Sequence, residues 1–199
     1  FSLFREFIKV VVDNRKDFIV IGSKTAIGYK ELFALIKSGN MFIGATNASN
    51  FITNYEYLNA KNIFIKDGVR YAKFGNIGWF TSFNVRENDY LELTKEYSEN
   101  EYSKYDNYDA INVDKTKDIP KDYYDVVGVP ITFLDKHNQN QFEIVGFRKG
   151  DDGKDLRVGG KDKFSRVLIK RKGGGMMNFV LNNYFGYVYG DYIDEIINE

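Results

Sequence analysis

The order of periodic segments in the first 45 residues constrains the fold most. Apolar residues repeat at the spacing of one helix face over residues 3–11, and an unbroken apolar run follows at residues 18–21 before Gly22. Helical spacing returns over residues 29–36, and residues 41–43 form another short apolar run. Helix, strand, helix, strand is the order of an α/β unit, whose short apolar strands are buried on both faces of a parallel sheet. We therefore expect part of a parallel sheet whose earlier strands are missing from the sequence.

The rest of the chain is predicted to be mainly β. Segments with strand character occupy residues 62–65, 70–74, 76–83, 131–134, 141–147 and 166–170. The pair Asp67-Gly68 separates the first two and is typical of a tight antiparallel hairpin. Residues 86–124 are rich in Tyr, Asp, Glu and Asn with weak periodicity, so we expect a long surface excursion that is functional or disordered. The glycines and charges of residues 148–163 predict a flexible loop.

Composition excludes some classes of protein and leaves others open. The 28 basic and 28 acidic residues cancel, so net charge neither indicates nor excludes a nucleic-acid partner. There is no cysteine, and the single histidine, His137, lies in a polar segment where we expect it at the surface, so no metal site is predicted. No apolar run approaches the roughly 18 residues of a membrane span. The first residues do not form a signal peptide, and we expect a cytoplasmic protein.

Both ends of the sequence are unusual. It opens at Phe1, without an initiator Met, inside an amphipathic helical pattern, so we interpret it as a piece of a longer protein. Near the other end, the triple glycine at residues 173–175 and the pair Met176-Met177 resemble a junction. A natural extension, a read-through product and a fusion scar all remain open for residues 179–199.

Five segments together carry a resemblance to a known family. They are FIVIGSKTAIGYKELFALI (18–36), NIGWFTSF (76–83), KYDNYDAINV (104–113), VGVPITFLDKHNQNQFEIVG (127–146) and RVLIKRK (166–172). None is a simple motif, but in their order and length they resemble the EcoRI-type adenine-specific DNA methyltransferases. We place the resemblance over residues 1–172 and expect it not to include the tail.

The resemblance implies an α/β fold divided into three parts. Residues 1–85 would be the C-terminal half of a Rossmann-like methyltransferase sheet, residues 86–172 a mixed, mainly β DNA-recognition region, and residues 173–199 a tail of uncertain origin. It also implies S-adenosylmethionine as the cofactor and double-stranded DNA as the partner of a monomeric enzyme. A restriction endonuclease acting on the same site is the further partner that a restriction-modification system would add.

The family's catalytic motif, Asn-Pro-Pro-Phe, precedes a helix of the kind predicted at residues 3–12. If Phe1 is its last residue, the catalytic Asn and both prolines lie outside this sequence, as does the glycine-rich loop for S-adenosylmethionine. We therefore expect the isolated chain to be inactive.

Methylation of adenine N6 requires an extruded base and acceptors that draw the N6 hydrogens, so that the nitrogen lone pair points at the methyl donor. By its match to the motif, Phe1 is the candidate that stacks on the adenine. Ser23 and Lys24 follow a strand at the edge where open α/β sheets bind ligands, although an ordinary turn is the alternative. The strand aromatics are ambiguous between a base pocket and the core. These candidates are Trp79, Phe80 and Thr81.

Candidates for DNA contact lie further along the chain. Tyr105, Asn107 and Tyr108 combine groups that stack on bases or hydrogen-bond their edges, and a satisfied polar loop is the alternative. The one strongly basic neighbourhood is suited to phosphate contact, unless it is a solvated face. Its members are Arg148, Lys149, Lys161, Lys163, Arg166, Lys170, Arg171 and Lys172.

Three classes of function remain in competition. An enzyme fragment of an adenine-N6 DNA methyltransferase is favoured by the resemblance. A non-catalytic DNA-binding or specificity module would use the same DNA-facing residues. A structural or phage-type interaction protein is suggested only by the tyrosine-rich composition and the unusual tail.

Overall fold

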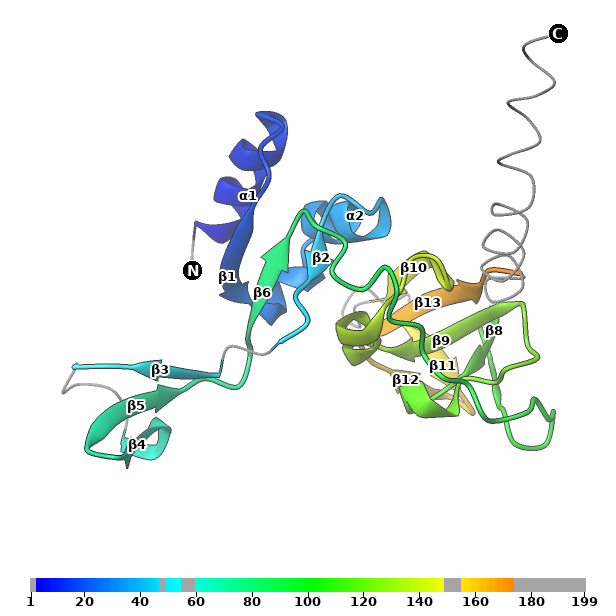
Figure 1. Cartoon of the computed structure of the whole chain (residues 1–199). Helices are drawn as coiled ribbons and strands as arrows, with labels where there is room; N and C mark the ends of the chain where they lie inside the picture. The colour runs from blue at the N-terminus through cyan, green and yellow to red at the C-terminus, as the bar shows by residue number, and fades with distance from the viewer. Residues whose placement is uncertain (1–2, 47–48, 55–59, 149–154, 174–199) are drawn as a thin grey trace, which may run out of the picture.

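The structure is a computed structural model that describes residues 3–46, 49–54, 60–148 and 155–173. It is a mixed α/β protein dominated by sheets (Figure 1). Its elements are α1 (Phe4–Asp13), β1 (Ile19–Ser23), η1 (Lys24–Gly28), α2 (Lys30–Lys37), β2 (Phe42–Ile43), β3 (Asn50–Ile52), η2 (Ala60–Asn62), β4 (Ile63–Lys66), β5 (Val69–Lys73), β6 (Ile77–Thr81), β7 (Lys104–Tyr105), β8 (Tyr108–Asn112), η3 (Thr116–Asp118), β9 (Val126–Pro130), η4 (Ile131–Lys136), β10 (Phe142–Arg148), β11 (Leu156–Val158), β12 (Lys161–Lys163) and β13 (Arg166–Arg171).

The first two predicted helices and strands are confirmed, but their sheet differs from the prediction. The N-terminal sheet has the order β1-β6-β2, and β6 is antiparallel to both neighbours. β1 and β2 therefore run in the same direction, with a reversed strand between them. The run at residues 18–21 was expected to be buried on both faces, yet Ile19 is 64% exposed. The reason is that helix α1 packs on the face that carries Gly22 and Phe80, whereas Ile19 points to the opposite face.

Helix α1 packs on this sheet through one turn-spaced pair. Phe4 and Ile8 are buried, and the Phe4 ring lies 5.1 Å from that of Phe80 in β6. Gly22 permits this approach, because a Cβ there would lie 2.5 Å from the Phe4 ring. Phe7 was predicted on the buried face but is half exposed. The apolar stripe of α1 is thus wider than the part of the helix that packs against other described residues.

A smaller sheet projects from the body between β2 and β6 (Figure 1). This projecting sheet has the order β3-β5-β4, with antiparallel pairing throughout. The predicted hairpin turn is confirmed, since Asp67 and Gly68 have φ angles of 51° and 75°. Two successive residues with positive φ form the type of turn that matches strand twist, and Asp-Gly is a preferred pair for it.

The second half of the chain builds a five-stranded sheet of order β10-β13-β9-β8-β7. β8 and β9 are parallel and the other pairs antiparallel. Strand predictions at residues 141–147 and 166–170 are confirmed, but the one at 131–134 is wrong. There Phe133 and Leu134 are buried residues of the 3-10 helix η4. The strand instead precedes it and ends at Pro130.

The loop predicted at residues 148–163 is also partly wrong. Its second half forms the β11–β12 hairpin, which turns at Gly159-Gly160 with φ angles of 55° and 75°. Both carboxylate oxygens of Asp106 accept from the N–H groups of these glycines, at 3.0 and 2.7 Å. Asp106, in the turn between β7 and β8, therefore holds the turn of the β11–β12 hairpin in place.

The excursion predicted at residues 86–124 is ordered and packs on the core. Leu91, Leu93 and Tyr97 are partly buried against the main hydrophobic cluster. The buried Gln141 amide donates to the carbonyl of Leu91 and accepts from its N–H, both at 2.7 Å. The buried Asn138 amide donates to the carbonyl of Arg86 at 2.7 Å. Side-chain amides thus supply hydrogen-bond partners for backbone groups of this extended segment, in place of a neighbouring strand.

One hydrophobic cluster joins the two halves of the described chain. Helix α2 packs on β10, and the rings of Phe33 and Phe147 stack with centroids 5.0 Å apart. Lys37 Nζ donates to the carbonyl of Val145 at 2.7 Å. Gly39, with a φ of 73°, follows the end of α2 as predicted. No helix in the described part of the chain is long and apolar enough to cross a membrane.

Candidate functional site

The carboxyl ends of β1 and β2 lie at one edge of the N-terminal sheet, because these strands run in the same direction. At the end of β1, Ser23 caps the short helix η1. Its Oγ lies 2.8 Å from Thr25 Oγ1 and accepts from Asn76 Nδ2 at 3.2 Å. Open α/β sheets bind ligands outside the carboxyl ends of their strands. We define the edge site as Ser23, Lys24, Thr25 and Asn76, with Asp135 opposite.

Lys24 connects this edge to the second half of the chain. Its side chain crosses Gly78, where a Cβ would lie 2.7 Å from Lys24 Cε. Its Nζ donates to Asp135 Oδ1 at 2.8 Å across a separation of 111 residues. Both side chains are partly buried, so the pair is screened less than a fully exposed one. The glycine in β6 thus opens the path that the lysine takes to its partner.

Two cavities lie near this edge of the N-terminal sheet, one at the end of β1 and one at the end of β2. The smaller one measures about 250 Å³ and lies between the Ser23–Thr25 turn and the first turn of α1. Phe4 and Tyr29 contribute aromatic walls, and Ser23 and Thr25 contribute hydroxyls. The Arg5 guanidinium lies 5.5 Å from the centre of the Tyr29 ring, which places a positive charge beside the opening.

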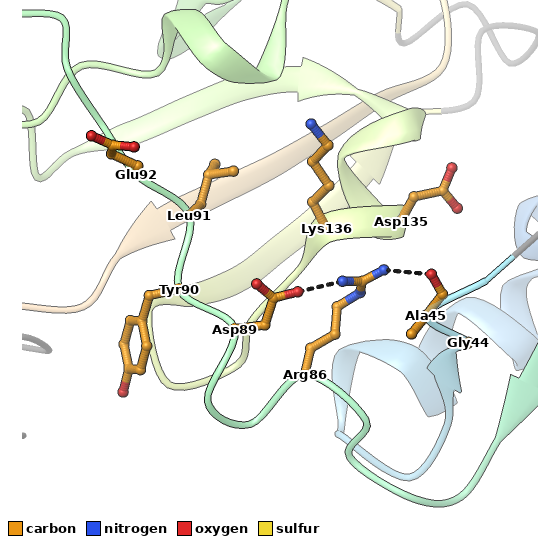
Figure 2. A pocket seen from close by; sticks show the side chains of 9 residues that line it. All are labelled: Gly44, Ala45, Arg86, Asp89, Tyr90, Leu91, Glu92, Asp135 and Lys136. Atoms are coloured by element: carbon orange, nitrogen blue, oxygen red, sulfur yellow. Dashed lines mark hydrogen bonds and ion pairs between the residues drawn. The ribbon is translucent and has the colours of Figure 1, made fainter.

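The larger cavity, of about 460 Å³, lies beyond the end of β2 (Figure 2). Arg86 reaches across its floor, where Nη1 pairs with Asp89 at 2.5 Å and Nη2 donates to the carbonyl of Ala45 at 3.4 Å. Asp135, the partner of Lys24, and Lys136 come from η4. Figure 2 shows that the Tyr90 ring points away from this group. The cavity is therefore polar and is bounded by both halves of the chain.

The structure places the predicted substrate residues in different environments. Phe1 lies outside the described residues. Ser23 and Lys24 belong to the edge site. In β6, Phe80 is fully buried in the core, and Thr81 is buried with its Oγ1 accepting from the N–H of Phe83 at 3.1 Å. Trp79 is partly exposed and packs against Gly44 at the end of β2, so it alone of the three strand candidates lies near both the surface and the edge.

Two of the predicted base-contacting residues are engaged inside the protein. Tyr105 is buried, and its hydroxyl donates to Asn112 Oδ1 at 2.9 Å. Burial raises the pKa of this hydroxyl well above its ordinary value. The Asn107 side chain donates to the carbonyl of Asp155 and accepts from the N–H of Arg157, at 2.6 and 3.1 Å. Tyr108 is partly exposed, with the Arg148 guanidinium 6.0 Å from its ring centre.

The predicted basic residues do not form one open patch. Arg166 is buried and pairs with Asp114, to which Lys163 also donates at 3.2 Å. Arg171 lies over the Tyr124 ring at 5.2 Å. Three lysines are exposed, and one lies outside the described residues. The exposed ones are Lys161, Lys170 and Lys172, and the other is Lys149.

Two titratable groups respond to these surroundings. Burial favours the neutral form of Asp114, but hydrogen bonds from Asn112 and Lys163 and the charge of Arg166 outweigh it and lower the pKa. His137 was predicted at the surface but is half-buried, with Nε2–H donating to the carbonyl of Phe142 at 3.1 Å. Burial lowers the pKa of His137.

Sequence reasoning missed Thr25, Arg86 and Asp135. Thr25 follows Ser23 at the spacing of a hydroxyl capping turn, a signal that was available. No local pattern marks Arg86 or Asp135, because their partners at Ala45 and Lys24 come from distant parts of the chain.

A family model described as "Adenine-specific methyltransferase EcoRI" matches residues 1–184. The chain belongs to this family. The match corrects the expected limit of the resemblance, because residues 173–184 of the tail fall inside it. No solved structure matches the chain.

Relatives in the EcoRI-type family include three type II methyltransferases. M.EcoRI of Escherichia coli is 46% identical over 181 residues. M.MgeORF184P of Mycoplasma genitalium is 35% identical over 197 residues, and M.MpnI of Mycoplasma pneumoniae is 33% identical over 199 residues. Each alignment covers 86% of this chain but 55%, 62% and 62% of the respective relative. The chain thus spans little more than half the length of these proteins.

The described residues do not fit S-adenosylmethionine by themselves. Sites for drug-sized ligands and cofactors are about 300–1,000 Å³, whereas the cavity at the end of β1 measures about 250 Å³. The turn that follows β1 has no glycine-rich loop, and Ser23 Oγ already receives the N–H of Thr25 at 3.4 Å. The larger cavity and another of about 460 Å³ between α1 and α2 are both lined mainly by charged side chains. We therefore derive no step of a reaction through this cofactor.

Proposed function

We propose that this chain forms part of a site-specific DNA adenine-N6 methyltransferase of a restriction-modification system that uses S-adenosylmethionine. The match of the EcoRI family model to residues 1–184 carries the proposal. The edge formed by β1 and β2, where an α/β sheet binds its ligand, supports it. In this proposal residues 1–85 belong to the catalytic half and residues 86–172 to the DNA-recognition region. Double-stranded DNA is the partner, a monomer acts on it, and an endonuclease cuts the same site.

We assign the extruded adenine to the smaller cavity. Phe4 lines it and stands three positions after Phe1, the residue that we propose stacks on the base. Thr25 and Tyr29 are exposed and offer a hydroxyl and an aromatic face, the groups that read and hold a flipped base. The chain's own contribution is therefore to bind and orient the base.

DNA contact is assigned to the exposed members of the predicted set. Tyr108 and Arg148 form one partly exposed pair on the five-stranded sheet. Lys161, Lys170 and Lys172 project to solvent and are free to reach phosphate. The buried candidates Tyr105 and Arg166 hold the sheet instead, through the contacts described above.

One observation favours a second function, a non-catalytic DNA-binding or specificity module. The described residues lack a complete site for the methyl donor, so they bind DNA without methylating it in this alternative. Such a module would show DNA binding that S-adenosylmethionine does not alter. It would also leave methyl transfer unaffected by substitutions in the edge site.

A chimera tests the proposal. Residues 1–184 replace the matching segment of M.EcoRI, and transfer of labelled methyl from S-adenosylmethionine to duplex DNA is measured. We expect transfer by the chimera. Within it, Thr25→Val should lower kcat/KM about 5- to 30-fold with unchanged DNA affinity, because one hydrogen bond at the reacting base is worth roughly 1–2 kcal/mol.

Ser38→Ala is the matched control, since Ser38 is a second hydroxyl residue at the far end of α2. Its kcat/KM should equal that of the parent chimera. A folded chimera that binds DNA but transfers no methyl group would contradict the enzyme proposal and favour the binding module.

A further inference from the structure

The projecting sheet presents an exposed face that combines aromatic and basic side chains. Residues directly opposite each other in antiparallel strands share a face. Ile52, Tyr71 and Phe64 therefore lie side by side across β3, β5 and β4. The rings of Phe64 and Tyr71 stack with centroids 5.3 Å apart and an interplanar angle of 13°. We call this the aromatic face, and its members are Asn50, Ile52, Phe64, Lys66, Val69, Tyr71 and Lys73.

The opposite face already supplies the packing of this small sheet. Ala72 is 1% exposed there, with Phe51 and Ile63 as its cross-strand neighbours. The Phe51 ring meets the Phe74 ring edge-on at 5.8 Å. On the aromatic face Ile52 is 70% exposed and Phe64 is 37% exposed, while Ile65 near the turn is the exposed apolar residue of the opposite face, at 68%. A stacked aromatic pair in a solvent-facing position is available to a partner.

Charge indicates what that partner is. Described residues 60–75 hold four cations, Lys61, Lys66, Arg70 and Lys73, against the single anion Asp67. Within the described part of the chain, none of the four cations has an ion pair or a side-chain hydrogen bond. The basic residues predicted to bind DNA differ, since Lys163 and Arg166 share Asp114. Among the described residues this positive charge is thus not neutralised, and it suits a polyanion.

The location of this sheet relates it to the edge site. Its strands lie in the chain between the carboxyl end of β2 and the start of β6, and Figure 1 shows them extending from that end of the N-terminal sheet. Lys66 pairs with Val69 at one end of the aromatic face and Lys73 with Asn50 at the other. At about 3.3 Å per residue, β5 separates these ends by roughly 13 Å, the axial length of about four base pairs.

We propose that the aromatic face binds duplex DNA beside the extruded base, with Lys66 and Lys73 on phosphates and the Phe64–Tyr71 pair against the sugar and base surface. This inference rests on the proposed function. It adds a DNA-contacting element outside residues 86–172. Phosphate contacts at both ends fix the register of the duplex, while the rings exclude water between them.

Fluorescence anisotropy of a labelled duplex, titrated with the 199-residue chain over a range of salt concentrations, tests the inference. Each lost phosphate contact lowers the slope of log K against log salt by about 0.9. The variant K66A/K73A should therefore lose about 1.8 in slope and on the order of 60-fold in affinity at 0.1 M salt. The control K61A/R70A removes the same charge from positions off the aromatic face and should lose less than half as much slope. Circular dichroism checks that both variants fold.

The outcomes separate the two proposals. If the wild-type chain shows no salt-dependent binding to DNA, DNA recognition by this chain fails and the inference fails with it. If the wild-type chain binds but K66A/K73A retains its slope, or both double variants lose slope equally, the aromatic face is not the DNA surface. Either of these last results overturns the inference alone and indicates that another part of the protein covers that face.

Discussion

Replacement of Gln141 by Leu should weaken the attachment of the extended segment around Leu91 to the core. The Gln141 amide makes two hydrogen bonds of 2.7 Å to the backbone of Leu91, one as donor and one as acceptor. Leucine has a similar size but can form neither bond. An unpaired buried backbone group costs about 1–3 kcal/mol, and the partial exposure of Leu91 favours the lower end. Two such groups, less the gain from burying an apolar side chain, give a loss of roughly 2 kcal/mol.

Urea and thermal unfolding measure this loss. For a chain of this size, about 2 kcal/mol corresponds to a fall in Tm of about 4–8 °C. The matched control is Gln139→Leu, the same substitution two positions away, where no hydrogen bond of this kind is made to the segment. We expect the control to change stability by less than about 0.5 kcal/mol. Equal stability of the two variants would refute the idea that the Gln141 amide holds the segment.

Three further predictions concern packing and titration. Gly128→Ala places a Cβ against the hydroxyl of the buried Tyr105 and should cost about 1–3 kcal/mol in unfolding free energy. The double variant that adds Tyr105→Ala should lose less than the sum of the two single losses, because the clash is then absent. The lowered pKa of Asp114 means that its contribution to stability is complete above about pH 4 and is lost as pH falls through the folded pKa, so Asp114→Asn should show a flatter acid limb in unfolding free energy than the wild type. Burial lowers the pKa of His137, so stability is complete above about pH 6.5 and falls as pH drops through the folded pKa. His137→Asn should abolish this step, and a step that persists in the variant would assign it to another group.

Local periodicity predicted the first helices and strands well. The spacing of Phe4 and Ile8 fixed α1, and Asp67-Gly68 fixed a hairpin turn, because both signals depend on neighbouring residues. The sequence does not show whether neighbouring strands pair in a parallel or an antiparallel direction. A short apolar run has the same composition in a parallel and in an antiparallel sheet, so the position of β6 between β1 and β2 required the three-dimensional structure.

The long segment after β6 carries an alternation of apolar and polar residues that is typical of an extended chain with one buried side. Leu91, Leu93 and Tyr97 stand at even spacing, and the structure buries this side of the chain while it exposes Glu92 and Glu96. The segment has this period of two, although its backbone pairs with side-chain amides and not with another strand. Buried amides such as those of Asn138 and Gln141 have no local signature, since polar residues are mostly exposed.

In the candidate site, too, residues with a local sequence signal were predicted, and residues that only the fold brings together were not. Ser23 and Lys24 were predicted from their place after a strand, which is a local argument. Asp135, the partner of Lys24, is 111 residues away and was beyond the reach of pattern analysis. Exposure also separates candidates of the same chemical type, since Arg166 is buried in an ion pair while Lys170 is open to solvent. A sequence shows which residues carry charge, but ion pairing in the fold decides which of those charges remain available.

The most direct test of the account is the identity of the methylated base. DNA treated with the M.EcoRI chimera and S-adenosylmethionine is digested to nucleosides and analysed by mass spectrometry. The account predicts N6-methyladenine at one position of a fixed DNA site, and less of it in the Thr25→Val variant than in the Ser38→Ala control. Methylated cytosine, or N6-methyladenine formed equally in both variants, would contradict the assignment of this chain to the adenine-binding edge of the enzyme.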